Sequence, residues 1–294
     1  MSERARAELA LIAVTILWGA SFVMVKSALD QVSNLFFLLM RFGIATITLL
    51  LVFRSRLLAK PELRAASLRG GLLAGLCLPV AYFFQTLGLR YTTPSKSAFI
   101  TGLTTALVPF FAALVYRNVP HVSEVVGVVG ATAGLALLTL PPGQFVLGFG
   151  DAITLCCTVA FALHILVLGR WSPVSNFELI STLQIGVTAL LIAAALPFQP
   201  VFVTWSPSVI TAVLLTGVLN TALAFSVMAW AQRHSSSTRV ALIFAIEPVS
   251  AAVMSYFAEG ERLSPRALLG AALILGGILL VELKPIGPVR HPQA

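Results

Sequence analysis

The sequence consists almost entirely of apolar runs separated by short polar connections. Each run has about 20 residues, the length that an α-helix needs to cross the hydrocarbon core of a bilayer. Backbone groups find no water there, so each run must satisfy its own hydrogen bonds as a helix. The predicted spans are residues 9–28, 34–53, 68–88, 95–116, 122–140, 149–169, 177–197, 207–230, 238–257 and 265–283. The sequence therefore predicts an all-α membrane protein with ten transmembrane helices.

The composition supports this class and disfavours several others. Hydrophobic residues make up 58% of the chain and charged residues 10%, a balance that is foreign to soluble domains. The formal net charge of +8 suits cytoplasmic loops, which collect Lys and Arg, and no motif indicates a nucleic acid partner. The connections leave no room for a nucleotide-binding domain, so no ATPase subunit is required. Catalytic and metal-ligand motifs are also missing, so we expect no enzyme activity and no cofactor.

The basic residues predict the orientation. The longest polar stretch, residues 54–69, holds five of the 19 basic residues and is interpreted as a cytoplasmic loop. With the N-terminus inside, 13 basic residues face the cytoplasm, five face outward, and Arg41 lies within a span. We therefore expect both termini in the cytoplasm.

The two halves of the chain match at one offset of 143 residues without a gap. The matching pairs include Glu8 with Asp151, Gly43 with Gly186, Lys96 with Arg239, Gly127 with Gly270, and Gly134 with Gly277. Each half holds five helices, an odd number, so the second half must enter the membrane upside down. Inverted repeats are typical of secondary transporters, with the substrate site where the halves meet. We predict two inverted five-helix repeats, 1–143 and 144–294, around a central cavity.

The same offset indicates which residues share that centre. Trp18 aligns with Phe161, Ser21 with His164, Tyr82 with Phe225, Arg41 with Gln184, and Thr104 with Glu247. Polar groups at membrane depth need partners and so face protein or a cavity. The predicted cavity-lining, substrate-binding residues are Trp18, Ser21, Tyr82, Gln85, Phe99, Phe161, His164, Asn220, Phe225 and Glu247. Structural roles remain open for three of them: core packing for Trp18, a satisfied histidine for His164, and a bond between helices for Asn220.

Glu247 is the most unusual of these residues, because it lies beside Pro248 near the middle of an apolar stretch, residues 237–257. A carboxylate is costly at that depth, and the proline leaves an upstream carbonyl unpaired. One interpretation is a cavity-facing group that exchanges protons or holds a cation. The alternatives are a structural ion pair, with Arg41 as the candidate partner, and a facilitator that needs no coupling ion.

Glycines mark close helix contacts. The fifth and tenth predicted helices carry Gly130 and Gly134, and Gly270, Gly276 and Gly277. Gly71 and Gly75 form the same pattern on the third helix. Small residues let helices approach closely, so we expect the fifth and tenth helices to form a scaffold and not the pathway.

Several segments together resemble the EamA-type drug/metabolite transporters. They are WGASF at 18–22 with Lys26, Arg41, QTLGLRYT at 85–92, AFITGL at 98–103, and Glu247-Pro248 followed by GERLS at 260–264 and Gly270. These motifs cover both repeats. One departure is Arg117-Asn118-Val119, where such proteins often carry a Gly-Glu pair.

The resemblance implies a ten-helix carrier of the bacterial inner membrane that exports small molecules such as amino acids by alternating access. We expect aromatic or neutral amino acids, since an aromatic-lined centre with few fixed charges suits a small zwitterion. A drug, a nucleobase or another metabolite is the alternative substrate. An intramembrane enzyme or sensor is disfavoured, because the chain has no nucleophile–base pair and no soluble effector domain. The partners are then the substrate and the lipid bilayer, and the oligomeric state is left open.

Overall fold

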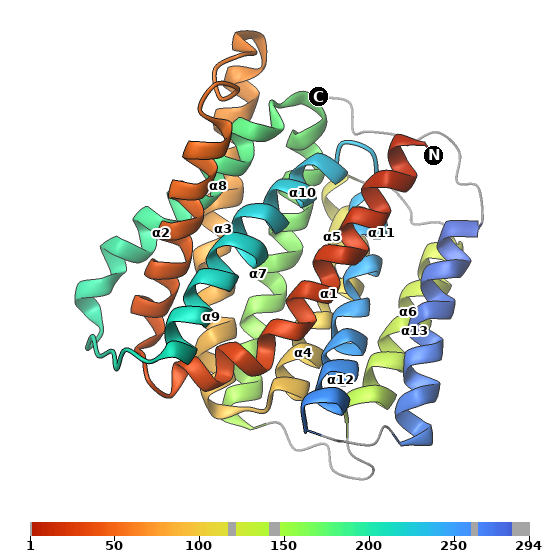
Figure 1. The fold of residues 1–294 in the computed structure, drawn as a ribbon. Helices are drawn as coiled ribbons and strands as arrows, with labels where there is room; N and C mark the ends of the chain where they lie inside the picture. The colour runs from red at the N-terminus through yellow and green to blue at the C-terminus, as the bar shows by residue number, and fades with distance from the viewer. Residues whose placement is uncertain (1, 117–121, 141–147, 260–263, 284–294) are drawn as a thin grey trace.

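The computed structural model describes residues 2–116, 122–140, 148–259 and 264–283 (Figure 1). Within them the chain is helical, with no β-strand and one isolated bridge between Val32 and Val203. The α-helices are α1 Glu3–Leu29, α2 Asn34–Phe53, α3 Arg64–Tyr91, α4 Pro94–Gly102, α5 Thr104–Tyr116, α6 Val122–Thr139, α7 Phe149–Trp171, α8 Phe177–Ala195, α9 Pro207–Gly217, α10 Ala224–Ala231, α11 Ser237–Phe244, α12 Ile246–Glu259 and α13 Pro265–Leu283. A π-helical segment, Val218–Leu223, joins α9 to α10.

These helices make ten spans, because α4 with α5, α9 with α10, and α11 with α12 each form one interrupted crossing. Eight spans are long and apolar enough to cross a membrane, and α6 and α13 are shorter apolar helices. The prediction of a ten-helix membrane protein is confirmed. Leucines on the outer surface remain widely exposed, Leu51 at 67% and Leu114 at 70%, as expected where acyl chains replace protein contacts.

Two spans begin several residues earlier than predicted: α1 begins at Glu3 and not at residue 9, and α3 begins before residue 68. Residues 54–69 were expected to form a loop, but α3 begins at Arg64, directly after the helical turn Pro61–Leu63. Proline is favoured in the first turn of a helix, and Ala, Leu and Arg are good helix formers. The basic residues at the start of α3 are therefore helical.

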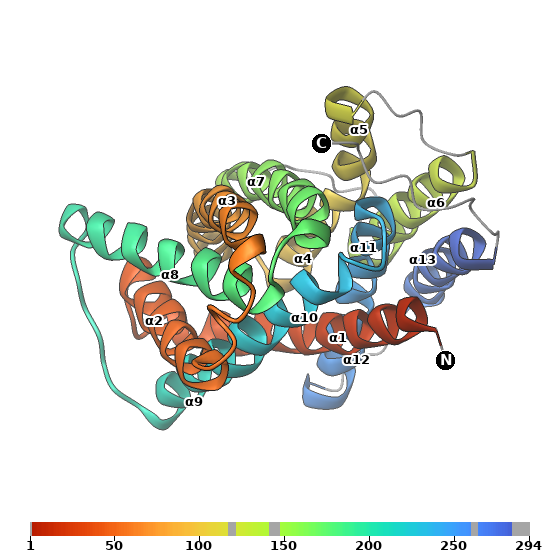
Figure 2. The same ribbon diagram turned by 90° about the horizontal axis from the view of Figure 1, so that it is seen from above.

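The spans run in alternating directions, so α1 begins at the upper end of the bundle in Figure 1 and α7 begins at the lower end. The end of α13 returns to the end where α1 begins. The halves interleave: α3 packs on α7 and α8, α1 packs on α12, and α6 packs on α13. Seen from above, α6 and α13 lie side by side at one edge of the bundle (Figure 2). The helices that face the centre therefore come from both repeats: α1 and α3 from the first, and α7 and α12 from the second.

Two spans break near the middle of the bundle. The first repeat breaks at Leu103, between α4 and α5, and the second breaks at Ala245, between α11 and α12. The second break follows from Pro248, which has no N–H to donate to the carbonyl of Phe244. The hydroxyl of Thr105, just after the first break, donates to the carbonyl of Ala241 on α11 at 2.9 Å. The two interrupted spans are therefore joined near their breaks.

The predicted scaffold pair is present, since α6 lies against α13 along its length. A Cβ atom on Gly134 would lie 2.5 Å from the carbonyl oxygen of Gly270, and one on Gly277 would lie 2.7 Å from that of Gly127. Side chains do not fit at such distances. Glycine therefore allows direct backbone contact between these helices.

The glycine pattern differs from the predicted one at two positions. A Cβ atom on Gly130 would meet only a carbonyl at 4.0 Å, and one on Gly276 would meet nothing within 4 Å. The contact follows a seven-residue spacing on α6 instead of the expected GxxxG. Gly71 and Gly75 do pack tightly, against Leu183 and Val187 of α8.

Candidate functional site

A cavity of about 80 Å³ lies between the inner helices of the two repeats. One water needs roughly 10–15 Å³ of such space, so the cavity holds several waters or one small solute. Its walls come from both halves of the chain, as the inverted repeat predicts. The lining residues are Trp18, Ser21, Phe22, Val25, Arg41, Tyr82, Gln85, Thr86, Leu89, Thr101, Gly102, Thr104, Thr105, Phe161, His164, Ile165, Phe225, Met228, Phe244 and Glu247.

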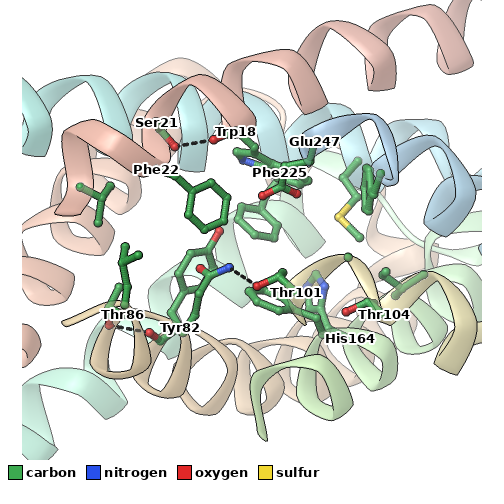
Figure 3. A pocket seen from close by; sticks show the side chains of 18 of the residues that line it. Trp18, Ser21, Phe22, Tyr82, Thr86, Thr101, Thr104, His164, Phe225 and Glu247 are labelled. Carbon is green, nitrogen blue, oxygen red and sulfur yellow. Dashed lines mark hydrogen bonds between the residues drawn. The ribbon is translucent and has the colours of Figure 1, made fainter. Parts of the chain in front are cut away.

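Trp18 of α1 forms part of an aromatic wall (Figure 3). Its ring centroid lies 5.6 Å from that of Phe225 and 5.0 Å from that of Phe244. Its indole N–H donates to the carbonyl oxygen of Asn220 at 2.8 Å. Asn220 lies in the π-helical segment, where the regular hydrogen-bond ladder is interrupted. Trp18 thus has both a structural bond and a face toward the cavity.

Tyr82 of α3 packs between two other aromatic rings of the cavity wall. Its ring lies 5.3 Å from Phe161 and 6.1 Å from Phe225, both in edge-on geometry. Edge-on contacts of this kind are favourable for aromatic pairs. Tyr82, Phe225 and Trp18 therefore form a continuous aromatic surface that crosses from one repeat to the other.

Arg41 is a buried cation at the cavity wall, and the sequence-based site list omitted it. Its Nε donates to the hydroxyl of Thr221 at 2.8 Å, and its Nη2 donates to the hydroxyl of Tyr82 at 3.2 Å. The guanidinium carbon lies 4.4 Å from the centre of the Tyr82 ring, within cation–π range. These contacts fix the side chain. Its place as a basic residue inside an apolar span was the signal that could have identified it.

Glu247 extends from the start of α12 into the cavity, beside Trp18 and Phe225 (Figure 3). The side chain is half-buried, and within the described residues its carboxylate has no hydrogen bond or ion pair. Arg41 lines the same cavity and attracts Glu247 through space, but its hydrogen bonds go to neutral hydroxyls, so the direct ion pair considered from the sequence is not formed. The carboxylate therefore remains available to a ligand or a proton.

The other polar side chains on the wall are paired. Gln85 donates from Nε2 to the hydroxyl of Thr101 at 3.2 Å. The Nε2 atom of buried His164 lies 2.7 Å from Oε1 of Gln184. His164 is thus a satisfied histidine that also borders the cavity. Ser21 donates back to the carbonyl of Trp18 at 2.7 Å within its own helix.

The structure places eight of the ten predicted site residues on the cavity wall. Two predictions of position are wrong. Phe99 turns into a separate apolar cluster with Ala131, Leu135 and Ile274. Asn220 donates to the carbonyl of Leu17 at 3.3 Å and so joins α1 to the π-helical segment, the alternative considered from the sequence. Whether the other eight bind substrate stays a prediction.

Some sequence features lie outside the described residues. These are the departure at 117–119 and most of the GERLS segment, at 260–263. The basic residues Arg262, Lys284 and Arg290, which contributed to the predicted orientation, lie there too.

Comparisons with known proteins agree with this geometry. A model of the EamA-like transporter family matches the chain twice, at residues 5–140 and 148–283. An uncharacterized transporter of Archaeoglobus fulgidus is 31% identical, with 96% of this chain and 87% of that protein covered. The uncharacterized transporter YyaM of Bacillus subtilis is 25% identical, with 96% and 94% covered. A solved crystal structure with a TM-score of 0.76 and 20% identity covers 95% of this chain and 98% of its own, which supports the fold.

Proposed function

Because this chain belongs to the EamA-like transporter family, we propose that it exports small zwitterionic metabolites, namely aromatic or neutral amino acids, by alternating access. The membrane would be the bacterial inner membrane, with both termini in the cytoplasm, as the bias of basic residues favours. We propose a carrier and not an enzyme. The family and its relatives, named as transporters, support that choice.

The observation that carries the substrate proposal is the pair of opposite charges on one aromatic cavity wall. Arg41 offers a fixed guanidinium, which suits a carboxylate. Glu247 offers a carboxylate that faces the cavity and interacts with Arg41 only through space, which suits an ammonium group. The aromatic surface of Trp18, Tyr82 and Phe225 offers an apolar contact for the side chain. A nucleobase or a simple cation would use only part of this set.

Glu247 also supports proton coupling. A charged carboxylate is costly at membrane depth. The carrier without substrate would therefore change conformation more easily when Glu247 is protonated. Substrate ammonium and proton would then occupy Glu247 in turn. An inward proton gradient would thereby drive export.

The test uses purified protein in liposomes loaded with a labelled aromatic amino acid. Competition by a panel should show exchange with aromatic and neutral amino acids, and none with nucleobases or quaternary ammonium drugs. Competition by nucleobases or drugs alone would contradict the substrate class.

Coupling is tested with Glu247→Gln, which keeps an oxygen acceptor but removes titration. This variant should keep substrate exchange at a reduced rate and lose the response to a proton gradient. Glu62→Gln, at an exposed acid outside the bundle, is the matched control. Normal gradient-driven transport in folded Glu247→Gln would rule out the proton role.

A further inference from the structure

A cluster of three polar side chains joins the two repeats at the lower end of the bundle in Figure 1, where α3 ends and α7 begins. Lys96 Nζ lies 3.3 Å from Oδ2 of Asp151, and the hydroxyl of Thr92 donates to Oδ1 of the same carboxylate. The side chain of Asp151 is only 5% exposed. We call these three residues the Lys96 triad.

A second cluster joins the repeats at the opposite end, where α1 and α11 begin. Arg239 Nη1 lies 3.6 Å from Oε1 of Glu8, and the hydroxyl of Ser235 donates to the same oxygen at 3.3 Å. Arg4, one turn earlier on α1, also donates from Nε to that oxygen at 2.7 Å and stays with Glu8 on the same helix. The side chain of Arg239 is 4% exposed. We call Glu8, Ser235 and Arg239 the Arg239 triad.

The two triads are equivalent, member by member. Each residue of one lies 143 positions from its counterpart: Thr92 from Ser235, Lys96 from Arg239, and Glu8 from Asp151. Hydroxyl, cation and carboxylate are matched in chemistry as well as in position. Each triad also crosses the boundary between the repeats. Inverted repeats move against each other around a central site, so these contacts lie where that motion would separate surfaces.

The triads are connected mechanically to the cavity. Lys96 and the cavity residue Thr101 lie on the short helix α4, which ends at the break at Leu103. Arg239 and the cavity residue Phe244 lie on α11, which ends at the break at Ala245. A tilt of either short helix about its break would widen one end of the cavity and pull its triad apart. Hinges of this kind are a few residues at the ends of elements.

We propose that the Lys96 triad and the Arg239 triad are the two gates of the carrier, opened in alternation. The proposal rests on the alternating-access function proposed above. Both triads are formed in this structure, so each end is bridged by an ion pair. Opening either end moves one buried charge away from its counter-charge, the Asp151 carboxylate (5% exposed) at one end and the Arg239 guanidinium (4% exposed) at the other, which is unfavourable. Opening both ends at once is thus penalised, as a carrier requires.

The gates differ in their surroundings. The side chain of Lys96 is 32% exposed, whereas Arg239 is 4% exposed and also donates to the carbonyl of Val281 at 3.4 Å. The Asp151 carboxylate accepts from Thr92 and from the backbone N–H of Gly148, whereas the Glu8 carboxylate is shared with Arg4.

The test follows access to the cavity with Ser21→Cys as a reporter and a charged, membrane-impermeant thiol reagent. Labelling rates are measured from each face, in right-side-out and inside-out vesicles. Background from Cys77, Cys156 and Cys157 is measured in the protein without the reporter and subtracted. The assay needs no substrate, so its outcome is independent of whether amino acids are transported.

Asp151→Asn weakens the Lys96 triad while the side-chain oxygen of Asn can still accept from the backbone N–H of Gly148, the N-cap of α7. It should raise labelling from the face that this triad closes by about tenfold, within the usual range of coupling between sites, and lower labelling from the other face. Glu8→Gln should do the reverse. The exchanged pair Lys96→Asp with Asp151→Lys should return both rates toward those of the parent.

Opposite effects at the two faces separate gating from a merely structural role, which would move both rates together. If an acid variant does not fold, Lys96→Gln and Arg239→Gln give the same readout. Unchanged rates, or shifts in the same direction at both faces, would overturn the proposal.

Discussion

The helix pair α6–α13 and the cavity helices meet the same environment in opposite ways. At α6–α13, glycines bring backbones into direct contact and leave no space between them. Around the cavity, aromatic and polar side chains hold the helices apart and leave about 80 Å³ unfilled. No described side chain of the scaffold pair lines the cavity.

The difference teaches where rigidity and adaptability are needed. Lipid tails are as apolar as leucine, so close packing drives the association of α6 with α13. Polar contacts such as those of Arg41 have discrete, exchangeable partners, and a ligand can replace one of them. We therefore expect substitutions in the scaffold to change stability and substitutions in the cavity to change transport.

The largest effect is expected at the scaffold. Gly277→Leu would place a side chain where the carbonyl of Gly127 lies, and overpacking of this kind destabilises by about 3 kcal/mol. Gly276→Leu, one residue away on α13 with nothing within 4 Å, should be tolerated. Midpoints of thermal unfolding in detergent compare the two. Equal midpoints for the two variants would contradict the claim that Gly277 lies in a tight helix contact and Gly276 outside it.

The next effect is expected at Arg41. Arg41→Met removes the guanidinium that we propose to hold the substrate carboxylate, and a charged hydrogen bond of this kind is worth about 1.5–3 kcal/mol, so transport should fall at least about tenfold. The unfolding midpoint should change less than in Gly277→Leu. Arg170→Met, at the exposed end of α7, is the control and should transport normally. Full activity of Arg41→Met would exclude Arg41 from the pathway.

A smaller effect is expected at Trp18. Trp18→Phe keeps an aromatic ring beside Phe225 but leaves the carbonyl of Asn220 without its indole donor, at a cost of about 1–2 kcal/mol. Substrate affinity should weaken by a few-fold and the midpoint of thermal unfolding should also fall, because Trp18 both lines the cavity and bonds to the backbone of a neighbouring helix. Trp205→Phe, at a tryptophan that is 55% exposed, should change neither. Substrate affinity is measured from the concentration dependence of exchange in liposomes, a readout that does not use tryptophan fluorescence.

The spans were predictable from the sequence because apolar length and short connections leave a membrane chain few alternatives. The breaks were only half predictable: Pro248 signals the one at Ala245, but no proline marks the one at Leu103. The position of Gly276 was missed since the sequence does not show which face of α13 meets α6.

The cavity wall was largely predictable, because the repeat offset identified residues that share a level in the membrane. It could not show which way a side chain turns around its helix. Phe99 turns into an apolar cluster for that reason. Arg41 was noticed as a basic residue within a span, but its bonds to Tyr82 and Thr221 depend on three helices meeting.

The smallest effect is expected at Tyr82, and it sharpens the comparison most finely. Tyr82→Phe removes one acceptor of Arg41 but keeps the ring 4.4 Å below the guanidinium and its contact with Phe161. A hydrogen bond from a charged donor contributes about 1.5–3 kcal/mol, but water in the cavity can replace the lost hydroxyl as the acceptor and offset most of the loss. The unfolding midpoint should therefore stay within experimental error while substrate affinity weakens about threefold to fivefold. The reverse outcome, lower stability with unchanged affinity, would mean that Tyr82 only packs the helices together and that Arg41 does not contact the substrate.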